Sequence, residues 1–196
     1  MLDQNLSGAA TSPEEFKDPR WARFLFASSG PVVWLWLINR LYMAYVYIPA
    51  GWEKITSGKW LFGDGAPIMN LVNGAIASDG TPAWYVWFLQ NVVTPLAGLF
   101  ATMVALGELA IGLGLLVGLL TGVAGFFASF VNGNFVLAGA LGSNPLLVIF
   151  GILIALAWKN AGWIGLDRYF IPWAHRRFWT APAEKNPGAG QPAPTT

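Results

Sequence analysis

The apolar stretch at residues 95–118 contains one ionisable side chain, Glu108, and this feature constrains the fold more than any other. A membrane helix needs about 20 mainly apolar residues, so the stretch is long enough to cross a bilayer. A carboxylate at the centre of such a helix costs about 2.5–3.5 kcal/mol if it faces lipid. We therefore predict that Glu108 faces other helices, where it has a partner or is protonated.

The composition supports a membrane location. The chain has 196 residues, of which 55% are hydrophobic and 11% are charged, whereas average chains carry about 25% charged residues. The net charge of +1 and the lack of a basic tail argue against nucleic-acid binding. The chain has no cysteine and one histidine, His175, so we expect no haem, iron–sulfur cluster or metal on it. A quinone needs none of these ligands.

Four apolar stretches predict four membrane spans, at about residues 31–50, 95–118, 120–141 and 145–158. Three of them begin with proline, which the first helical position tolerates because its N–H is not needed there. Thr94 and Asn144 precede two of these prolines and are candidate N-caps. No charged residue lies between the second and third spans, so we expect a tight turn. The predicted fold class is all-α, an integral membrane four-helix bundle.

Basic residues near the span ends indicate the orientation. They precede the first span and follow the fourth, at Lys17, Arg20, Arg23, Lys159, Arg168, Arg176 and Arg177. This bias predicts that both termini are cytoplasmic, in a bacterial or archaeal cytoplasmic membrane, and that the long connection at 51–94 lies outside. Short interfacial helices are expected in the N-terminal segment and in this aromatic outer loop.

Three regions follow from these predictions. Residues 1–30 form a cytoplasmic segment with an interfacial amphipathic helix, and residues 31–169 form the membrane domain. Residues 170–196 form a cytoplasmic tail whose end is rich in proline, alanine and glycine, a composition typical of disorder.

The two deep charges, Arg40 and Glu108, are expected to meet. A rise of about 1.5 Å per residue from the predicted span ends puts them at similar depths on antiparallel helices. Tyr47 and Lys54 share the helical face of Arg40, and Asn132 lies on a small, polar face of the third span. These residues predict a polar interior that opens outward toward Lys54. It is either a structural ion pair with an asparagine that fixes helix register, or a ligand or proton site.

Five short motifs follow one another along the chain. They are Asn39-Arg40-Leu-Tyr-Met-Ala-Tyr, Ala50-Gly-Trp-Glu-Lys54, Gly107-Glu108-Leu-Ala-Ile-Gly-Leu-Gly-Leu-Leu-Val-Gly118, Asn132-Gly-Asn-Phe and Gly162-Trp-Ile-Gly-Leu-Asp167. In this order and spacing they resemble the DoxX/DoxD family of small four-helix membrane proteins, over roughly residues 31–169. That family includes the membrane subunit of thiosulfate:quinone oxidoreductase, and other members associate with terminal oxidases or thiol-stress enzymes. Its arginine, lysine and glutamate carry over onto Arg40, Lys54 and Glu108.

The resemblance implies a redox setting and leaves two main hypotheses. In the first, Lys54 and Arg40 attract thiosulfate or a related anion, Glu108 relays a proton, and Tyr47 or Asn132 hydrogen-bonds a quinone that accepts the electrons. In the second, the chain is a non-catalytic anchor or accessory subunit of a respiratory or other oxidoreductase complex. Membrane lipid and other subunits of a redox complex are the expected partners in both. A small-solute transporter fits less well, because no inverted repeat with broken helices is visible.

Overall fold

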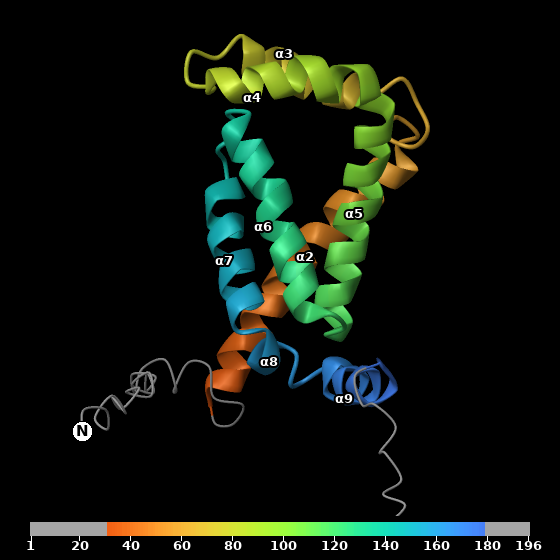
Figure 1. Cartoon of the computed structure of the whole chain (residues 1–196), viewed down its shortest axis with the longest axis vertical. Coiled ribbons are helices and arrows are strands. Elements are labelled where there is room, and N and C mark those ends of the chain that lie inside the picture. Colours follow the sequence, from red (N-terminus) through yellow and green to blue (C-terminus); the bar gives the residue numbers. More distant parts are fainter. Residues whose placement is uncertain (1–30, 179–196) are drawn as a thin grey trace, which may run out of the picture.

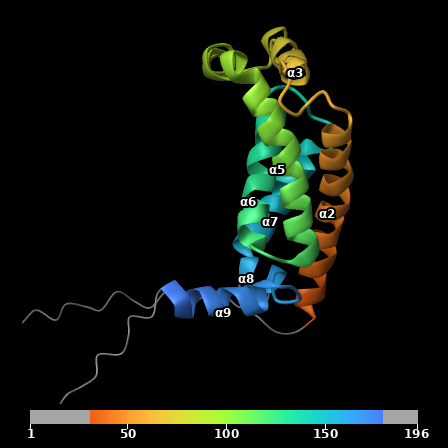
Figure 2. The same ribbon diagram turned by 90° about the vertical axis from the view of Figure 1, so that its right-hand side faces the viewer.

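The computed structural model describes residues 31–178, and every regular element in that range is a helix. Four helices lie side by side along the long axis of the molecule (Figure 1, Figure 2): α2 (Val32–Thr56), α5 (Ala97–Val117), α6 (Thr121–Leu137) and α7 (Asn144–Leu156). Helix α2 packs along α5, and α6 packs along α7. The all-α prediction is confirmed. The interfacial helix predicted within residues 1–30 lies outside the described residues.

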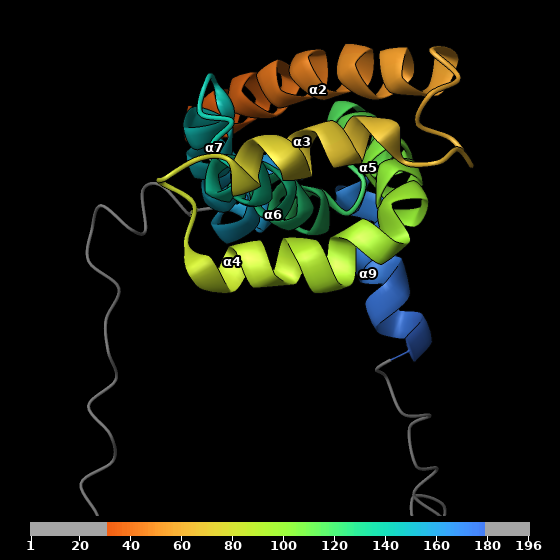
Figure 3. The same ribbon diagram turned by 90° about the horizontal axis from the view of Figure 1, so that it is seen from above.

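Short helices lie across both ends of this group. At one end, α3 (Ala66–Ile76) and α4 (Ala83–Phe88) run next to each other and form a layer that we call the roof (Figure 1, Figure 3). At the other end, α9 (Asp167–Phe178) lies across the axis and follows the short α8 (Trp158–Ala161). The chain therefore has helices in the connection at 51–94, as predicted, and a further helix at the start of the predicted tail.

The second long helix does not begin at Pro95 as predicted. The chain is helical from Ala83 to Val117, and it turns between α4 and α5 through the π-helical η1 (Leu89–Val93) and the 3-10 helical η2 (Thr94–Leu96). Pro95 has no N–H to continue the α-helical hydrogen bonds, and helix axes bend at such interruptions. Thr94 therefore lies inside a continuous helical segment and is not an N-cap.

Two other boundaries also differ from the prediction. Helix α2 continues past Pro49 to Thr56, so Lys54 belongs to its last turn. At the start of α7, Asn144 is already helical, and its side-chain amide donates to Ala140 O at 2.5 Å instead of capping the helix.

The predicted tight turn between the second and third spans is confirmed. Residues 118–120 connect α5 to α6, with Gly118 and Leu120 at φ 68° and 51°. The Leu119 N–H donates to Gly114 O at 2.9 Å. A bond of this reach is typical of a helix C-terminus that closes with a left-handed residue.

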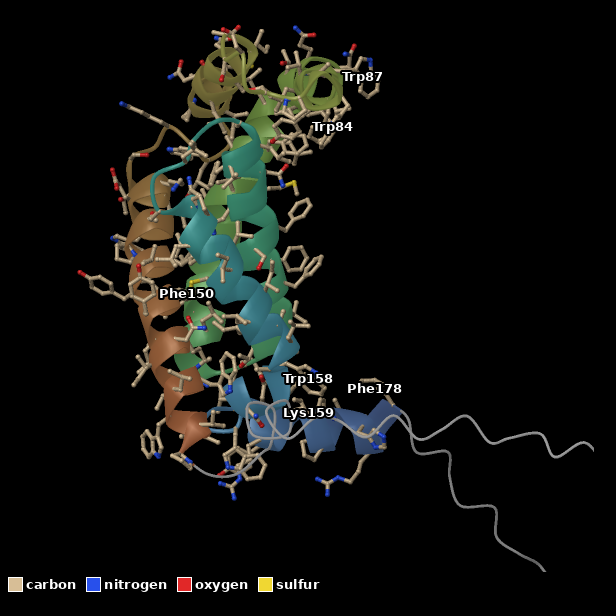
Figure 4. The ribbon with its side chains drawn as sticks, turned by 90° about the vertical axis from the view of Figure 1, so that its left-hand side faces the viewer. Trp84, Trp87, Phe150, Trp158, Lys159 and Phe178 are labelled. Atoms are coloured by element: carbon tan, nitrogen blue, oxygen red, sulfur yellow. The ribbon has the colours of Figure 1, made fainter. Side chains whose placement is uncertain are left out.

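One helical segment of the described chain, Ala83–Val117, is long and apolar enough to cross a membrane, and α3, α6 and α7 are shorter apolar helices. The long helices nevertheless expose large apolar side chains, among them Trp34, Ile38, Leu99, Phe126 and Ile149. In contrast, Arg40, Glu108 and Asn132 are buried. An apolar exterior around a polar interior is the arrangement that lipid favours. Aromatic residues flank both ends, as membrane interfaces favour: Trp84 and Trp87 at the roof, and Trp158 and Phe178 at the α9 end (Figure 4).

Glycines bring the paired helices close together. A Cβ atom at Gly112 of α5 would lie 2.8 Å from the backbone nitrogen of Ile48 on α2. A Cβ atom at Gly125 of α6 would lie 2.9 Å from the backbone nitrogen of Ala155 on α7. Because lipid tails are as apolar as the side chains, close packing at small residues is a main source of attraction between helices in a membrane.

We expect Gly112→Ala and Gly125→Ala each to lower the thermal unfolding midpoint by several degrees, because overpacking costs about 1–3 kcal/mol. Gly133→Ala is the matched control, since no atom lies within 4 Å of a Cβ built there. Its midpoint should stay the same or rise, as alanine is the better helix former. Thermal unfolding in a single detergent measures all three, and equal midpoints would contradict the packing argument.

Candidate functional site

Glu108 faces the neighbouring helices, as predicted, and its partner is Lys54. The Lys54 Nζ and Glu108 Oε2 atoms are 2.5 Å apart, with the two side chains 20% and 5% exposed. The Lys54 ammonium also lies 5.2 Å from the centre of the Trp60 ring, in the connection that leads to the roof. Lys54 thus links α2 to Glu108 of α5 and lies next to the connection that leads to the roof.

Arg40 does not pair with Glu108, which corrects the central expectation from the sequence. Its Nη1 donates to Ala161 O at 2.9 Å, and its Nη2 donates to Ile164 O at 2.7 Å. The acidic group that acts on the Arg40 charge is Asp167. Arg40 is therefore held by the segment that joins α8 to α9.

The antiparallel register of α2 and α5 explains why the two charges stay apart. Successive contacts place Lys54 beside Glu108, Gly51 beside Leu109, Ile48 beside Gly112, and Arg40 beside Gly118. From Glu108 to Gly118 the rise along the helix is about 15 Å. Glu108 consequently lies near the middle of α5, beside the last turn of α2, whereas Arg40 lies beside the end of α5.

Asp167 joins the α5–α6 turn to the start of α9. Its carboxylate accepts hydrogen bonds from the backbone N–H groups of Leu120 and Thr121, at 2.6 and 2.8 Å. Its own N–H donates to Gly118 O at 2.8 Å. A carboxylate at the N-terminus of α6 satisfies N–H groups that the helix leaves unpaired. Sequence reasoning assigned this residue no role beyond membership of a motif.

Three glycines make room for these two side chains. A Cβ atom at Gly165 would lie 2.8 Å from Arg40 Nη1, and one at Gly118 would clash with the same nitrogen. A Cβ atom at Gly162 would lie 2.6 Å from Asp167 Oδ2. Together these contacts tie α2, the α5–α6 turn and residues 161–167 to one another. We call this group the Arg40–Asp167 clamp.

Tyr47 and Asn132 form a second buried polar pair, between α2 and α6. The Asn132 side-chain amide donates to the Tyr47 hydroxyl oxygen and, at 2.8 Å, to Ala128 O. The Tyr47 hydroxyl donates to the same carbonyl at 3.0 Å. Glu108 is close enough to act electrostatically on Tyr47. Four of the predicted site residues thus form two pairs, Lys54–Glu108 and Tyr47–Asn132, and we call these four residues the polar site.

The polar site offers a limited set of chemical groups. It has one partly exposed cation, one buried carboxylate that can exchange a proton, and a hydroxyl–amide pair that can hydrogen-bond a neutral ligand. In residues 31–178, no group of three or more acidic or histidine side chains is placed to hold a metal ion. Anion attraction, proton exchange and hydrogen bonding are therefore the functions that this arrangement supports.

Comparison with known proteins identifies one family. The family model described as DoxX matches residues 35–141, which is more than half of the chain and includes four of the five motifs found in the sequence. Neither a curated protein nor a solved structure matches the chain. The clamp residues 161–167 lie outside the matched range.

We expect Arg40→Lys to lower the thermal unfolding midpoint by several degrees. A lysine keeps the charge but cannot donate to two carbonyls through a planar fork, and leaving a buried acceptor unpaired costs about 1–3 kcal/mol. Arg177→Lys, on the exposed side of α9, is the matched control and should leave the midpoint unchanged. Equal stability of the two variants would remove the clamp as a structural element.

A double-mutant cycle tests the Lys54–Glu108 pair. Lys54→Met leaves a buried carboxylate without its partner, a change that typically costs about 3 kcal/mol or more. Glu108→Gln should cost less, because the partly exposed Lys54 can turn toward water. The double variant should recover part of the stability lost by Lys54→Met, and the exposed Glu53→Gln should have no effect. Thermal unfolding midpoints that combine additively would show that the pair is not coupled.

Proposed function

Because the chain belongs to the DoxX family, whose members are membrane proteins associated with redox systems, we propose that it is an integral membrane subunit of such a system. The observation that carries this proposal is the ion pair between the partly exposed Lys54 and the buried Glu108, among helices whose outer faces are apolar. Ionisable groups within a membrane are costly, and where they occur they mark ion, proton or substrate paths.

In this proposal α2, α5, α6 and α7 cross the membrane together. The 21 residues of α5 extend about 32 Å, close to the roughly 30 Å thickness of a bilayer core. Helix α9 carries Arg168, Arg176 and Arg177, so the positive-inside rule places its end of the molecule in the cytoplasm. The roof then lies on the outer side, and the chain before α2 and after α9 lies on the cytoplasmic side.

The reaction we propose is oxidation of thiosulfate, or of a related small sulfur anion, with a quinone as acceptor. Two thiosulfate ions that join through a new sulfur–sulfur bond release two electrons, and a quinone takes up these two electrons together with two protons. Lys54 lies at the outer end and attracts the anion. An anion at Lys54 weakens its hold on the Glu108 carboxylate, which can then take up a proton from water at the partly exposed Lys54 and pass it to the reduced acceptor, while Tyr47 and Asn132 hydrogen-bond the acceptor.

Arg40 is not part of the proposed reaction. The sequence hypothesis gave it a catalytic and anion-binding role, but its guanidinium donates to two backbone carbonyls. Lys54 is about 21 Å away along α2. The contacts of Arg40 therefore support a structural role in the Arg40–Asp167 clamp.

The second candidate is a non-catalytic anchor or accessory subunit of a respiratory or other oxidoreductase complex. It is favoured by the way in which both polar pairs, Lys54–Glu108 and Tyr47–Asn132, are satisfied within the chain, as a structural role requires. The exposed Trp84 and Trp87 of the roof would then contact another subunit at the membrane surface (Figure 4).

Quinone reduction by the purified chain in nanodiscs, with thiosulfate as donor, separates the two candidates. If the polar site is catalytic, the wild type reduces quinone and Glu108→Gln slows the reaction about a hundredfold, as expected for loss of a proton-transfer group. Glu53→Gln, an exposed neighbour of Lys54, is the control and should keep the wild-type rate. An unchanged rate in folded Glu108→Gln would remove Glu108 from the mechanism. A wild-type chain that is inert but co-purifies with an oxidase would establish the second candidate.

A further inference from the structure

A large cavity lies between α5 and α6, on the side of α5 that does not face α2. Its volume is about 1010 Å³, which is at the upper end of the range of roughly 300–1,000 Å³ found for ligand pockets. Figure 1 shows why it exists: α5 and α6 meet at their short connecting turn and diverge toward the roof. We call this cavity the α5–α6 groove.

The lining of the groove is apolar along almost its whole length. Side chains from α5 and α6, such as Met103, Ile111, Val123 and Phe127, form its walls. Among residues 31–178, no charged side chain lines it, and Tyr85 and Asn134 supply its polar side chains. A groove without charge is unsuited to an anion, a metal ion or a phospholipid headgroup, and it is suited to a hydrocarbon chain.

The roof closes one end of the groove. Tyr85 and Phe88 of α4, together with Leu89 of η1, line that end, and α4 runs next to α3 on the side away from α2 (Figure 3). Along α6 the lining extends from Leu120 to Phe135, about 23 Å, which is more than half of the roughly 30 Å bilayer core. A helix that spans the membrane would be blocked by α4, whereas a flexible chain that ends beneath the roof would not.

The closed end carries neutral hydrogen-bonding groups. The Tyr85 hydroxyl donates to the backbone oxygen of Asn134 at 3.1 Å and lies 3.2 Å from its side-chain oxygen. The Asn134 amide nitrogen donates to Phe130 O at 2.8 Å. An amide group has two hydrogens and a hydroxyl oxygen accepts hydrogen bonds as well as donating one. The end of the groove can therefore donate to an uncharged oxygen atom of a ligand.

We propose that the α5–α6 groove binds one long-chain lipid with an uncharged, carbonyl-bearing head, and that the head lies beside Tyr85 and Asn134. The chain of the lipid runs between α5 and α6 toward the turn at Leu120. A quinone with a long isoprenoid chain belongs to this class of lipid and is the probe for the test. The proposal concerns binding alone, and it stands whether or not the polar site is catalytic.

Gly107 offers a way to block the groove without disturbing the helix packing. It lines the groove, and no atom lies within 4 Å of a Cβ built there. Gly133 of α6 is equally open but does not line the groove, so Gly133→Leu is the matched control for Gly107→Leu. Leucine is a good helix former at both positions.

The test loads the full chain in detergent with a long-chain ubiquinone, removes free quinone by gel filtration, and measures the quinone retained by extraction. We expect Gly107→Leu to retain about one quinone per chain fewer than the wild type and Gly133→Leu, because a quinone held at Tyr47 and Asn132 would be common to all three. Asn134→Leu removes the side-chain amide donor at the closed end and should weaken retention about tenfold, the effect of one lost hydrogen bond of roughly 1.4 kcal/mol. It keeps the assay decisive if Gly107→Leu fails to fold.

Three results would overturn the proposal. The first is equal retention of quinone by folded Gly107→Leu and Gly133→Leu. The second is equal retention of a phosphatidylglycerol in the same assay, which would show that an uncharged head is not selected. The third is a wild-type dimer that Gly107→Leu converts to a monomer, which would show that a second copy of the chain fills the groove. Because the readout is bound quinone, loss of turnover in Glu108→Gln leaves this test unaffected.

Discussion

The hydrogen bonds from Arg40 to the carbonyls of Ala161 and Ile164 determine how the helices meet at the α9 end. They fasten α2 to the segment before α9, and Asp167 in that segment fastens the α5–α6 turn. The helices are thus joined firmly at one end by polar contacts. At the other end the chain bends at η1 and η2 to form the roof, and α5 and α6 separate (Figure 1). The groove between them follows from this difference between the two ends.

The charged groups of the interior differ in their surroundings: Arg40 belongs to the clamp, whereas Lys54 and Glu108 form a separate ion pair. At the α9 end, Arg40 is 3% exposed and its Nη1 and Nη2 donate to backbone carbonyls, so its charge fixes structure. At the roof end, Lys54 is partly exposed and holds Glu108 through one ion pair. A partner that reaches water can be exchanged for a ligand at far lower cost than one that is sealed in the interior. For this reason a ligand can compete for Lys54 more readily than for Arg40.

The sequence was sufficient to predict the all-α fold, the tight α5–α6 turn and the inward face of Glu108, because these depend on local composition and helical periodicity. It was not sufficient to predict the partner of Glu108. That choice depends on the register between α2 and α5, and the expected limits at residues 50 and 95 do not coincide with the ends of these helices, Thr56 and Ala97. Helix α9 was also missed, because its sequence is too polar to stand out among apolar stretches and its start at Asp167 is fixed by contacts with a distant turn.

Helix α5 separates the two proposed sites by the width of one helix. Adjacent residues on a helix differ by about 100° in direction, so Glu108 faces α2 while Gly107 faces the groove. Ile111, one turn further on, belongs both to the packed core and to the groove lining. A ligand in the groove therefore lies against the helix that holds the carboxylate without touching the ion pair. A lipid in the groove can then stabilise the position of α5, and with it the Lys54–Glu108 contact, through packing alone. This structural effect does not require the chain to perform a reaction.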